Sequence, residues 1–135
     1  MKIPRFAAPL PIDEVLDDVR AALRTNGTAV LVAAPGAGKT TRVPLALLEE
    51  PWRGNQKIIV LEPRRLAARA AAERMAATLG STLGRDIGLR ARLASQTGPG
   101  VAVEVVTEGV FTRMILDDPE LKGVAAILFD EFHER

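Results

Sequence analysis

Short runs of apolar residues alternate along this chain with longer stretches in which apolar residues recur every three or four positions. The short runs are typical of buried strands, and the longer stretches are typical of helices with one buried face. Such alternation predicts an α/β domain with a mostly parallel sheet and helices on both faces. The predicted strands are 28–33, 57–61, 87–93, 101–106 and 124–129, and the predicted helices are 12–25, 39 to about 50, 64–79 and 109–116.

Three of these helices have features of their own. In the first, a buried stripe is expected from Ile12, Val15, Leu16, Val19 and Leu23. In the second, Pro44 has no N–H to donate to the carbonyl of Thr40, so a late start or a kink is expected. The third is rich in alanine, and its predicted inward residues are Leu66, Ala67, Ala70, Ala71, Met75 and Thr78.

Composition places the chain in a broad class. Its 135 residues suit one domain, and hydrophobic residues make up 47%, which favours a globular fold. No apolar run approaches the ~20 residues that a membrane span needs. The first residues lead into no signal-peptide core, and the chain has no cysteine, so a cytoplasmic protein without membrane association is expected.

Charge is unevenly distributed. Residues 51–93 carry nine basic and three acidic side chains, whereas residues 94–135 carry three basic and eight acidic ones. A basic middle segment could face a polyanion such as nucleic acid. The alternative is a solvated, arginine-rich helix in which Arg69 pairs with Glu73 one turn away.

The first motif spans residues 33–40 and reads Ala-Ala-Pro-Gly-Ala-Gly-Lys-Thr, between a predicted strand and a predicted helix. Glycines let backbone N–H groups approach phosphate oxygens, and the start of the helix adds a partial positive charge. Lys39 would reach the β- and γ-phosphates, and Thr40 would offer its hydroxyl to Mg²⁺. The candidate ATP-binding residues are Ala34, Pro35, Gly36, Ala37, Gly38, Lys39, Thr40 and Thr41.

The second motif, Asp130-Glu131-Phe132-His133, follows an apolar strand that would deliver carboxylates to the edge of the sheet. Asp130 would hold Mg²⁺ together with Thr40. Glu131 is placed to orient or deprotonate an attacking water. The candidate catalytic residues are Lys39, Asp130, Glu131 and His133.

These two motifs resemble motifs I and II of superfamily 2 helicases of the DEAH/RHA branch. Residues 62–68 resemble motif Ia, residues 107–111 resemble motif Ib, and Gly-Lys-Thr-Thr-x-x-Pro at residues 38–44 matches the branch, Pro44 included. Residues 10–12, before the first predicted helix, and residues 44–48, after the first motif, look most like the bacterial HrpB type. The sequence departs from the family pattern at two positions. Ala33 stands where the usual phosphate-binding motif begins with glycine, and Phe132 stands where the branch has alanine.

The resemblance implies a RecA-like P-loop NTPase fold and the ATP-binding domain of an ATP-dependent RNA helicase that uses ATP and Mg²⁺. It places Arg64, Arg65 and Thr107 near the sugar-phosphate backbone of single-stranded RNA, or of DNA. It also implies that residues 1–135 are an incomplete first RecA-like domain, truncated after the strand of motif II, and that the C-terminal helicase domain is missing. Such a fragment alone would be nearly inactive, because the second domain supplies arginines to the transferring phosphate.

Two other functions stay open from the residues themselves. One is another P-loop phosphotransferase, such as a small kinase or a GTPase, although the guanine-reading Asn-Lys-x-Asp of a GTPase does not occur. The other is a nucleotide-binding module without turnover.

Overall fold

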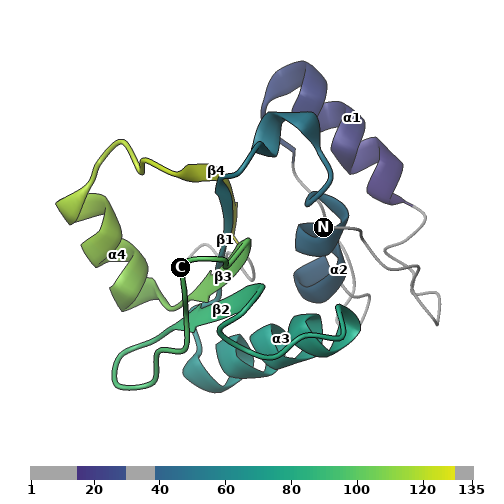
Figure 1. The fold of residues 1–135 in the computed structure, drawn as a ribbon. Helices are drawn as coiled ribbons and strands as arrows, with labels where there is room; N and C mark the ends of the chain where they lie inside the picture. Colours follow the sequence, from purple (N-terminus) through teal and green to yellow (C-terminus); the bar gives the residue numbers. More distant parts are fainter. Residues whose placement is uncertain (1–14, 30–38, 130–135) are drawn as a thin grey trace.

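The computed structural model describes residues 15–29 and 39–129. The helices in these ranges are α1 (Leu16–Asn26), α2 (Lys39–Ala46), α3 (Arg65–Thr78) and α4 (Glu108–Asp117), with a short 3-10 helix η2 (Pro51–Arg53). The strands are β1 (Lys57–Leu61), β2 (Ile87–Arg90), β3 (Val103–Val106) and β4 (Val124–Phe129). Figure 1 shows α4 on one face of the sheet, and α1, α2 and α3 on the other.

The described strands form one parallel sheet in the order β2-β3-β1-β4. Leu61 at the end of β1 pairs in register with Val106 on one side and with Phe129 on the other, so the carboxyl ends of three strands meet at one edge. α3 connects β1 to β2, and α4 connects β3 to β4, as parallel pairing requires. The predicted α/β fold with helices on both faces is confirmed. The predicted strand at 28–33 lies outside the described residues except for its first two positions.

Alternation along the strands divides the core between the two faces. Ile58 and Val60 point into a large cluster with α1, α2 and α3, whereas Ile59 points into a smaller cluster with Phe111 of α4. Parallel strands buried on both faces are continuously apolar, as the sequence Lys-Ile-Ile-Val-Leu of β1 is after its first residue.

The first two helices bear out part of what the sequence predicts. Val15, Leu16, Val19 and Leu23 of the predicted stripe pack on the large cluster, and Gly27 ends α1 with φ 76°. Ile12 lies outside the described residues. The second helix does not start late: α2 begins at Lys39, passes through Pro44 and ends at Ala46. It therefore ends about one turn earlier than expected.

The predicted inward face of α3 is correct at Ala71 and Met75, which are buried, but wrong at three other positions. Leu66 is 86% exposed, and Ala70 and Thr78 are also exposed. The stripe is instead rotated by about one residue, or ~100°, around the helix. Arg69 and Glu73 are about half exposed and pair with each other, so their side of the helix lies outside the core. The buried side chains are Ala68, Ala71, Ala72, Met75 and Ala76.

Three strands differ from expectation, and one of them, β3, begins at Val103, two residues later than predicted. β2 ends at Arg90 rather than Leu93, because the chain turns at Leu93 (φ 65°) and returns so that Gln96 exchanges both backbone hydrogen bonds with Leu89 at 2.8 Å. This return covers the outer edge of β2. The predicted burial of the last strand is also wrong, since β4 is half-buried and, among the described strands, pairs with β1 alone. In the parts of the chain that the structure describes, no helix is long and apolar enough to cross a membrane.

Candidate functional site

Of the predicted phosphate cradle, residues 34–41, the structure describes only residues 39–41, which form the start of α2. Lys39 is the first residue of α2, and Thr40 and Thr41 lie half-buried in its first turn. The next turn is held firmly, because Val43, Leu45 and Ala46 are buried in the large cluster against α3 and β1. The start of a helix presents backbone N–H groups without intrahelical partners, which suits phosphate oxygens. Of the predicted site residues, Ala34, Pro35, Gly36, Ala37, Gly38, Asp130, Glu131 and His133 lie outside the described ranges.

The carboxyl edge of the sheet brings together the starts of the predicted motifs Ia and Ib. The backbone N–H of Glu62, one residue beyond β1, donates to the carbonyl of Val106 at 2.9 Å. Thr107, one residue beyond β3, donates its N–H to the carbonyl of Arg90 at 3.3 Å. β4 ends at the same edge, at Phe129, the residue that precedes Asp130 in the sequence.

Arg64 is oriented by a buried carboxylate. It is the N-cap residue of α3, and its backbone N–H donates to Oε1 of Glu62 at 3.4 Å. Its guanidinium Nε lies 3.8 Å from the same oxygen. The Glu62 side chain is buried while that of Arg64 is largely exposed, so the carboxylate holds the backbone N–H and Nε of an arginine that lies at the surface. Arg65, the first residue of α3, is also exposed.

Thr107 is placed differently from the two arginines. It is the buried N-cap residue of α4, and its carbonyl accepts the N–H of Phe111 at 2.9 Å. Little of its side chain is accessible, so a ligand at this position would meet mainly the start of α4. The structure thus places all three predicted nucleic-acid residues at the starts of two helices on one edge of the sheet.

A shallow hollow of about 390 Å³ lies beside Arg65, between α3 and the segment after β2. The pairing of Arg69 with Glu73, which is the alternative to nucleic-acid contact, is present at 2.8 Å, and Arg69 also donates to Gln96 at 3.1 Å. The residues that line the hollow are Arg65, Leu66, Arg69, Leu89, Ala91 and Ala94.

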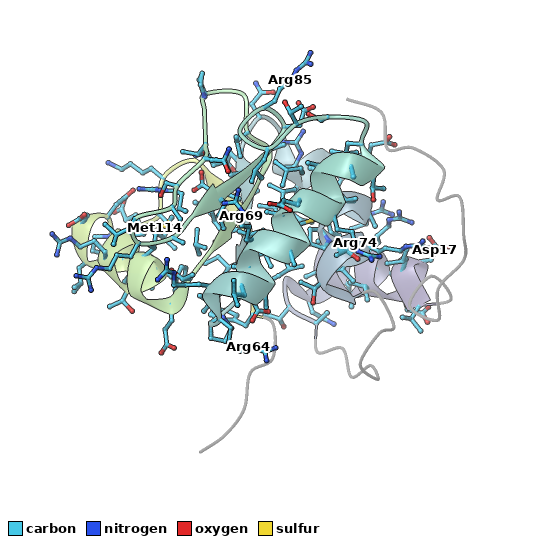
Figure 2. The ribbon with its side chains drawn as sticks, turned by 90° about the horizontal axis from the view of Figure 1, so that it is seen from below. Asp17, Arg64, Arg69, Arg74, Arg85 and Met114 are labelled. Atoms are coloured by element: carbon cyan, nitrogen blue, oxygen red, sulfur yellow. The ribbon has the colours of Figure 1, made fainter. Side chains whose placement is uncertain are left out.

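The basic middle segment does not form one patch. Figure 2 shows Arg64 at the start of α3 and Arg85 beyond its opposite end. Arg53 donates to the carbonyls of Leu48 and Gln56 at 2.7 and 3.0 Å. Some basic side chains of this segment therefore bind groups of the protein itself, and only part of the segment's basic residues are exposed near the carboxyl edge of the sheet.

Sequence reasoning missed a buried carboxylate on β3. Glu104 is fully buried, and its Oε2 accepts from the hydroxyl of Thr97 at 2.6 Å and lies 3.4 Å from Nζ of Lys57. Its Oε1 lies 3.7 Å from Arg90. A glutamate inside the apolar run Val-Ala-Val-Glu-Val-Val was the available signal, because such a charge is buried only with partners. Within residues 15–29 and 39–129, no three acidic or histidine side chains gather as a metal site would need.

Known proteins resemble this chain over most of its length. The family described as Flavivirus DEAD domain matches residues 23–134. Among curated proteins, the chain is 51% identical over 126 residues to the ATP-dependent RNA helicase HrpB of Escherichia coli strain K12. It is 36% identical over 132 residues to the ATP-dependent RNA helicase DHX30 of Gallus gallus.

Solved structures agree with this. The crystal structure of the Escherichia coli DEAH/RHA helicase HrpB superposes with a TM-score of 0.86 at 51% identity, covering 93% of this chain. A second structure, of the Escherichia coli DExH-box NTPase HrpB, gives a TM-score of 0.88 at 49% identity. The chain spans only a small part of these relatives, 16% of the Escherichia coli protein and 11% of the chicken protein.

Proposed function

The chain belongs to the Flavivirus DEAD domain family, and on that premise we propose that it is the ATP-binding part of an ATP-dependent RNA helicase. The observation that carries the proposal is the 51% identity, over 93% of this chain, to a protein described as an ATP-dependent RNA helicase. The protein from Gallus gallus with the same description supports the same reading at 36% identity.

We propose that residues 34–41 bind ATP. Lys39 would pair with the β- and γ-phosphates, and the first turn of α2 would direct backbone N–H groups at them. The burial of α2 in the large cluster supports this role, because a fixed helix can hold phosphate oxygens without reorganising.

We propose further that Thr40 and Asp130 hold Mg²⁺, that Glu131 orients the attacking water, and that His133 belongs to the same site. A bound Mg²⁺ would neutralise the charge that develops on the phosphate oxygens. The position of Phe129 at the carboxyl edge, paired in register with Leu61, supports this assignment, since Asp130 is the next residue in the sequence.

For the nucleic acid, we propose backbone contacts by Arg64 and Arg65 and by the start of α4 at Thr107. Guanidinium groups and helix N-termini both suit phosphate oxygens and read no base sequence. Two observations support one path for the nucleic-acid strand across these residues. Both arginines are exposed, and Glu62 lies near Thr107 because β1 and β3 pair side by side. Single-stranded RNA is the expected partner because of the relatives' descriptions.

We propose that residues 1–135 form the first RecA-like domain in part, and that the second RecA-like domain lies outside them. The much greater length of the relatives supports this division. Hydrolysis would be coupled to unwinding in the longer protein, which we place in the cytoplasm. By themselves these residues would turn ATP over slowly, since loss of a catalytic arginine costs about 10³–10⁵-fold in related phosphoryl-transfer enzymes.

The test is binding and turnover of Mg²⁺-ATP by the chain, with and without single-stranded RNA, beside Lys39→Ala. We expect binding that Lys39→Ala abolishes, and negligible turnover even with RNA. Rapid turnover would contradict the division into two domains. Equal binding by the unchanged chain and Lys39→Ala would contradict the assignment of the cradle. Glu131→Gln separates a catalytic site from a nucleotide-binding module without turnover. If the site is catalytic, this variant should still bind ATP but lose the residual turnover, whereas in a binding module it should change nothing.

A further inference from the structure

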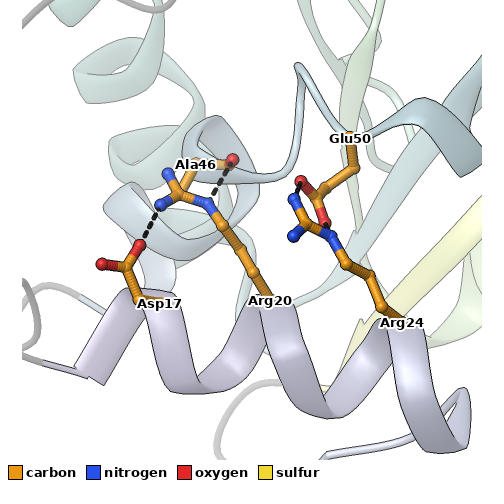
Figure 3. Close-up of polar contacts among 5 residues, drawn as sticks. All are labelled: Asp17, Arg20, Arg24, Ala46 and Glu50. Carbon is orange, nitrogen blue, oxygen red and sulfur yellow. Dashed lines mark hydrogen bonds and ion pairs between the residues drawn. The ribbon is translucent and has the colours of Figure 1, made fainter.

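The last turn of α1 is joined to the segment that follows α2 by a two-pronged ion pair. Nε and Nη2 of Arg24 donate to the two carboxylate oxygens of Glu50 at 2.8 and 2.7 Å, as Figure 3 shows. The Glu50 side chain is 4% exposed, and Arg24 supplies the opposite charge and two hydrogen bonds that a buried carboxylate needs. The hydrogen bonds and the charge of Glu50 raise the pKa of Arg24 above its ordinary value, so the guanidinium remains protonated.

A second arginine of α1 caps the end of α2. Nε of Arg20 donates to the carbonyl of Ala46, the last residue of α2, at 3.3 Å, and Asp17 holds the same guanidinium at 2.7 Å. Carbonyls at the end of a helix lack intrahelical partners, and a cation there opposes the negative end of the helix dipole. Val19 and Leu23 of α1 also pack on the cluster that buries Leu45.

These contacts bracket the predicted phosphate cradle in the sequence. Arg20–Ala46 and Arg24–Glu50 each join residues 26 positions apart, and residues 34–41 lie inside both loops. Both contacts hold the end of α2 and the segment after it against α1, and α2 carries Thr40 and Thr41 in its first turn. The described part of α2 is eight residues long, and a helix of this length needs tertiary contacts to be stable.

We propose that Arg20 and Arg24 are positioning residues for nucleotide binding. They hold the far end of α2 so that its first turn is already oriented when the phosphates arrive. The inference rests on the proposed function, since it assigns α1 to the same nucleotide site. Because neither arginine is assigned a contact with the nucleotide, substituting them weakens affinity without removing any phosphate contact.

The test compares the affinity for Mg²⁺-ATP, by calorimetric titration, of the unchanged chain and four variants: Arg24→Gln, Arg20→Gln, Arg24→Lys and the neutral pair Arg24→Gln with Glu50→Gln. Arg113→Gln is the matched control, because it breaks an exposed ion pair with Asp117 on the opposite face of the sheet. We expect Arg24→Gln to weaken binding about 5–10-fold, in the usual range of coupling between sites. Arg24→Lys should recover part of this loss, and Arg113→Gln should bind normally.

Amide hydrogen exchange of α2 is measured on the same samples without nucleotide, together with their melting temperatures. At a temperature where the Arg24→Gln variant is fully folded, its exchange is compared with that of the unchanged chain. An increase that is larger in α2 than in α4 supports the proposed role of Arg24. Unchanged affinity in Arg24→Gln, Arg20→Gln and the neutral pair overturns it, as does a loss explained by unfolding alone. Lys39→Ala separates this proposal from the proposed nucleotide site. If Lys39→Ala binds ATP as well as the unchanged chain does, the assignment of the nucleotide site is wrong. If the unchanged chain does not bind ATP, both proposals are wrong.

Discussion

Glu104 shows how much a single residue can organise in this fold. Its carboxylate lies under the segment that returns from β2, and it joins Lys57 of β1, Arg90 of β2 and Thr97 of that segment. Its register partner on β2 is Gly88, where a Cβ atom would stand 2.9 Å from the hydroxyl of Thr97. Glycine at this position therefore gives the threonine room to reach the carboxylate.

We expect Glu104→Ala to lower the free energy of unfolding by about 2–4 kcal/mol, measured by urea denaturation. Removing one member of a buried ionic group leaves the others without a partner, and the partial exposure of Lys57 and Arg90 lets them recover some hydration. Glu73→Ala is the control, because it breaks only an exposed pair and should cost under about 1 kcal/mol. Equal, small effects of both substitutions would show that the buried group contributes little.

At this scale, the sequence predicts residues whose chemistry is local and cannot predict partners brought by the fold. Gly38, Lys39 and Thr40 are recognisable from their spacing between a predicted strand and a predicted helix, so the sequence alone is enough to propose the cradle. Glu62 and Glu50 cannot be assigned in the same way. Each is a glutamate next to a proline, and only the three-dimensional arrangement brings Arg64 or Arg24 to its carboxylate.

Among the elements, α3 shows where periodicity becomes ambiguous. Its alanines fit both a buried and an exposed face, so the predicted inward stripe follows the one large apolar residue near its start, Leu66, which is in fact exposed. The positions of Arg69 and Glu73 are the better guide, since charged residues are rarely buried without partners. Ala72, at 0% exposure, lies in the buried stripe, and Ala70 lies outside it.

The same substitution at these two neighbouring positions tests the orientation of α3. Ala72→Leu should lower the free energy of unfolding by about 1–3 kcal/mol, because the larger side chain must fit a filled space. Ala70→Leu, in water, should change it by less than about 0.5 kcal/mol. Urea denaturation of both variants gives the comparison, and a larger loss for Ala70→Leu would restore the stripe that includes Leu66.

Element existence can be predicted from the apolar pattern more securely than element ends. β1 and β4 end where their apolar runs end, whereas β2 stops before Ala91 because a tertiary contact, the pairing of Leu89 with Gln96, redirects the chain. α2 ends soon after Pro44, which removes one helical hydrogen bond. Half-burial of β4 depends on its position in the strand order, which no local pattern contains.

For the whole molecule, the fold class and the resemblance to DEAH/RHA helicases of the HrpB type are confirmed by the parallel sheet and by the superposition with HrpB. The basic middle segment, for which charge alone left contact with a polyanion or a solvated arginine-rich helix open, has fewer cations exposed at one edge than its count of basic residues suggests. Lys57 and Arg90 face Glu104, and Arg53 caps backbone carbonyls. The exposed cations Arg64 and Arg65 remain at the carboxyl edge, while Arg85 lies beyond the far end of α3.

This separation of charge leads to a test of the proposed nucleic-acid surface, in which single-stranded RNA of several sequences is titrated at increasing salt. Arg64→Ala and Arg65→Ala should weaken binding similarly for every sequence, and each should reduce the slope of log K against log salt by about 0.7, since one phosphate contact releases that share of counterions from a single strand. Arg85→Ala removes the same charge from the opposite end of α3 and should leave both quantities nearly unchanged. An equal effect of Arg85→Ala would mean that RNA responds to net charge alone, and that the carboxyl edge is not its path.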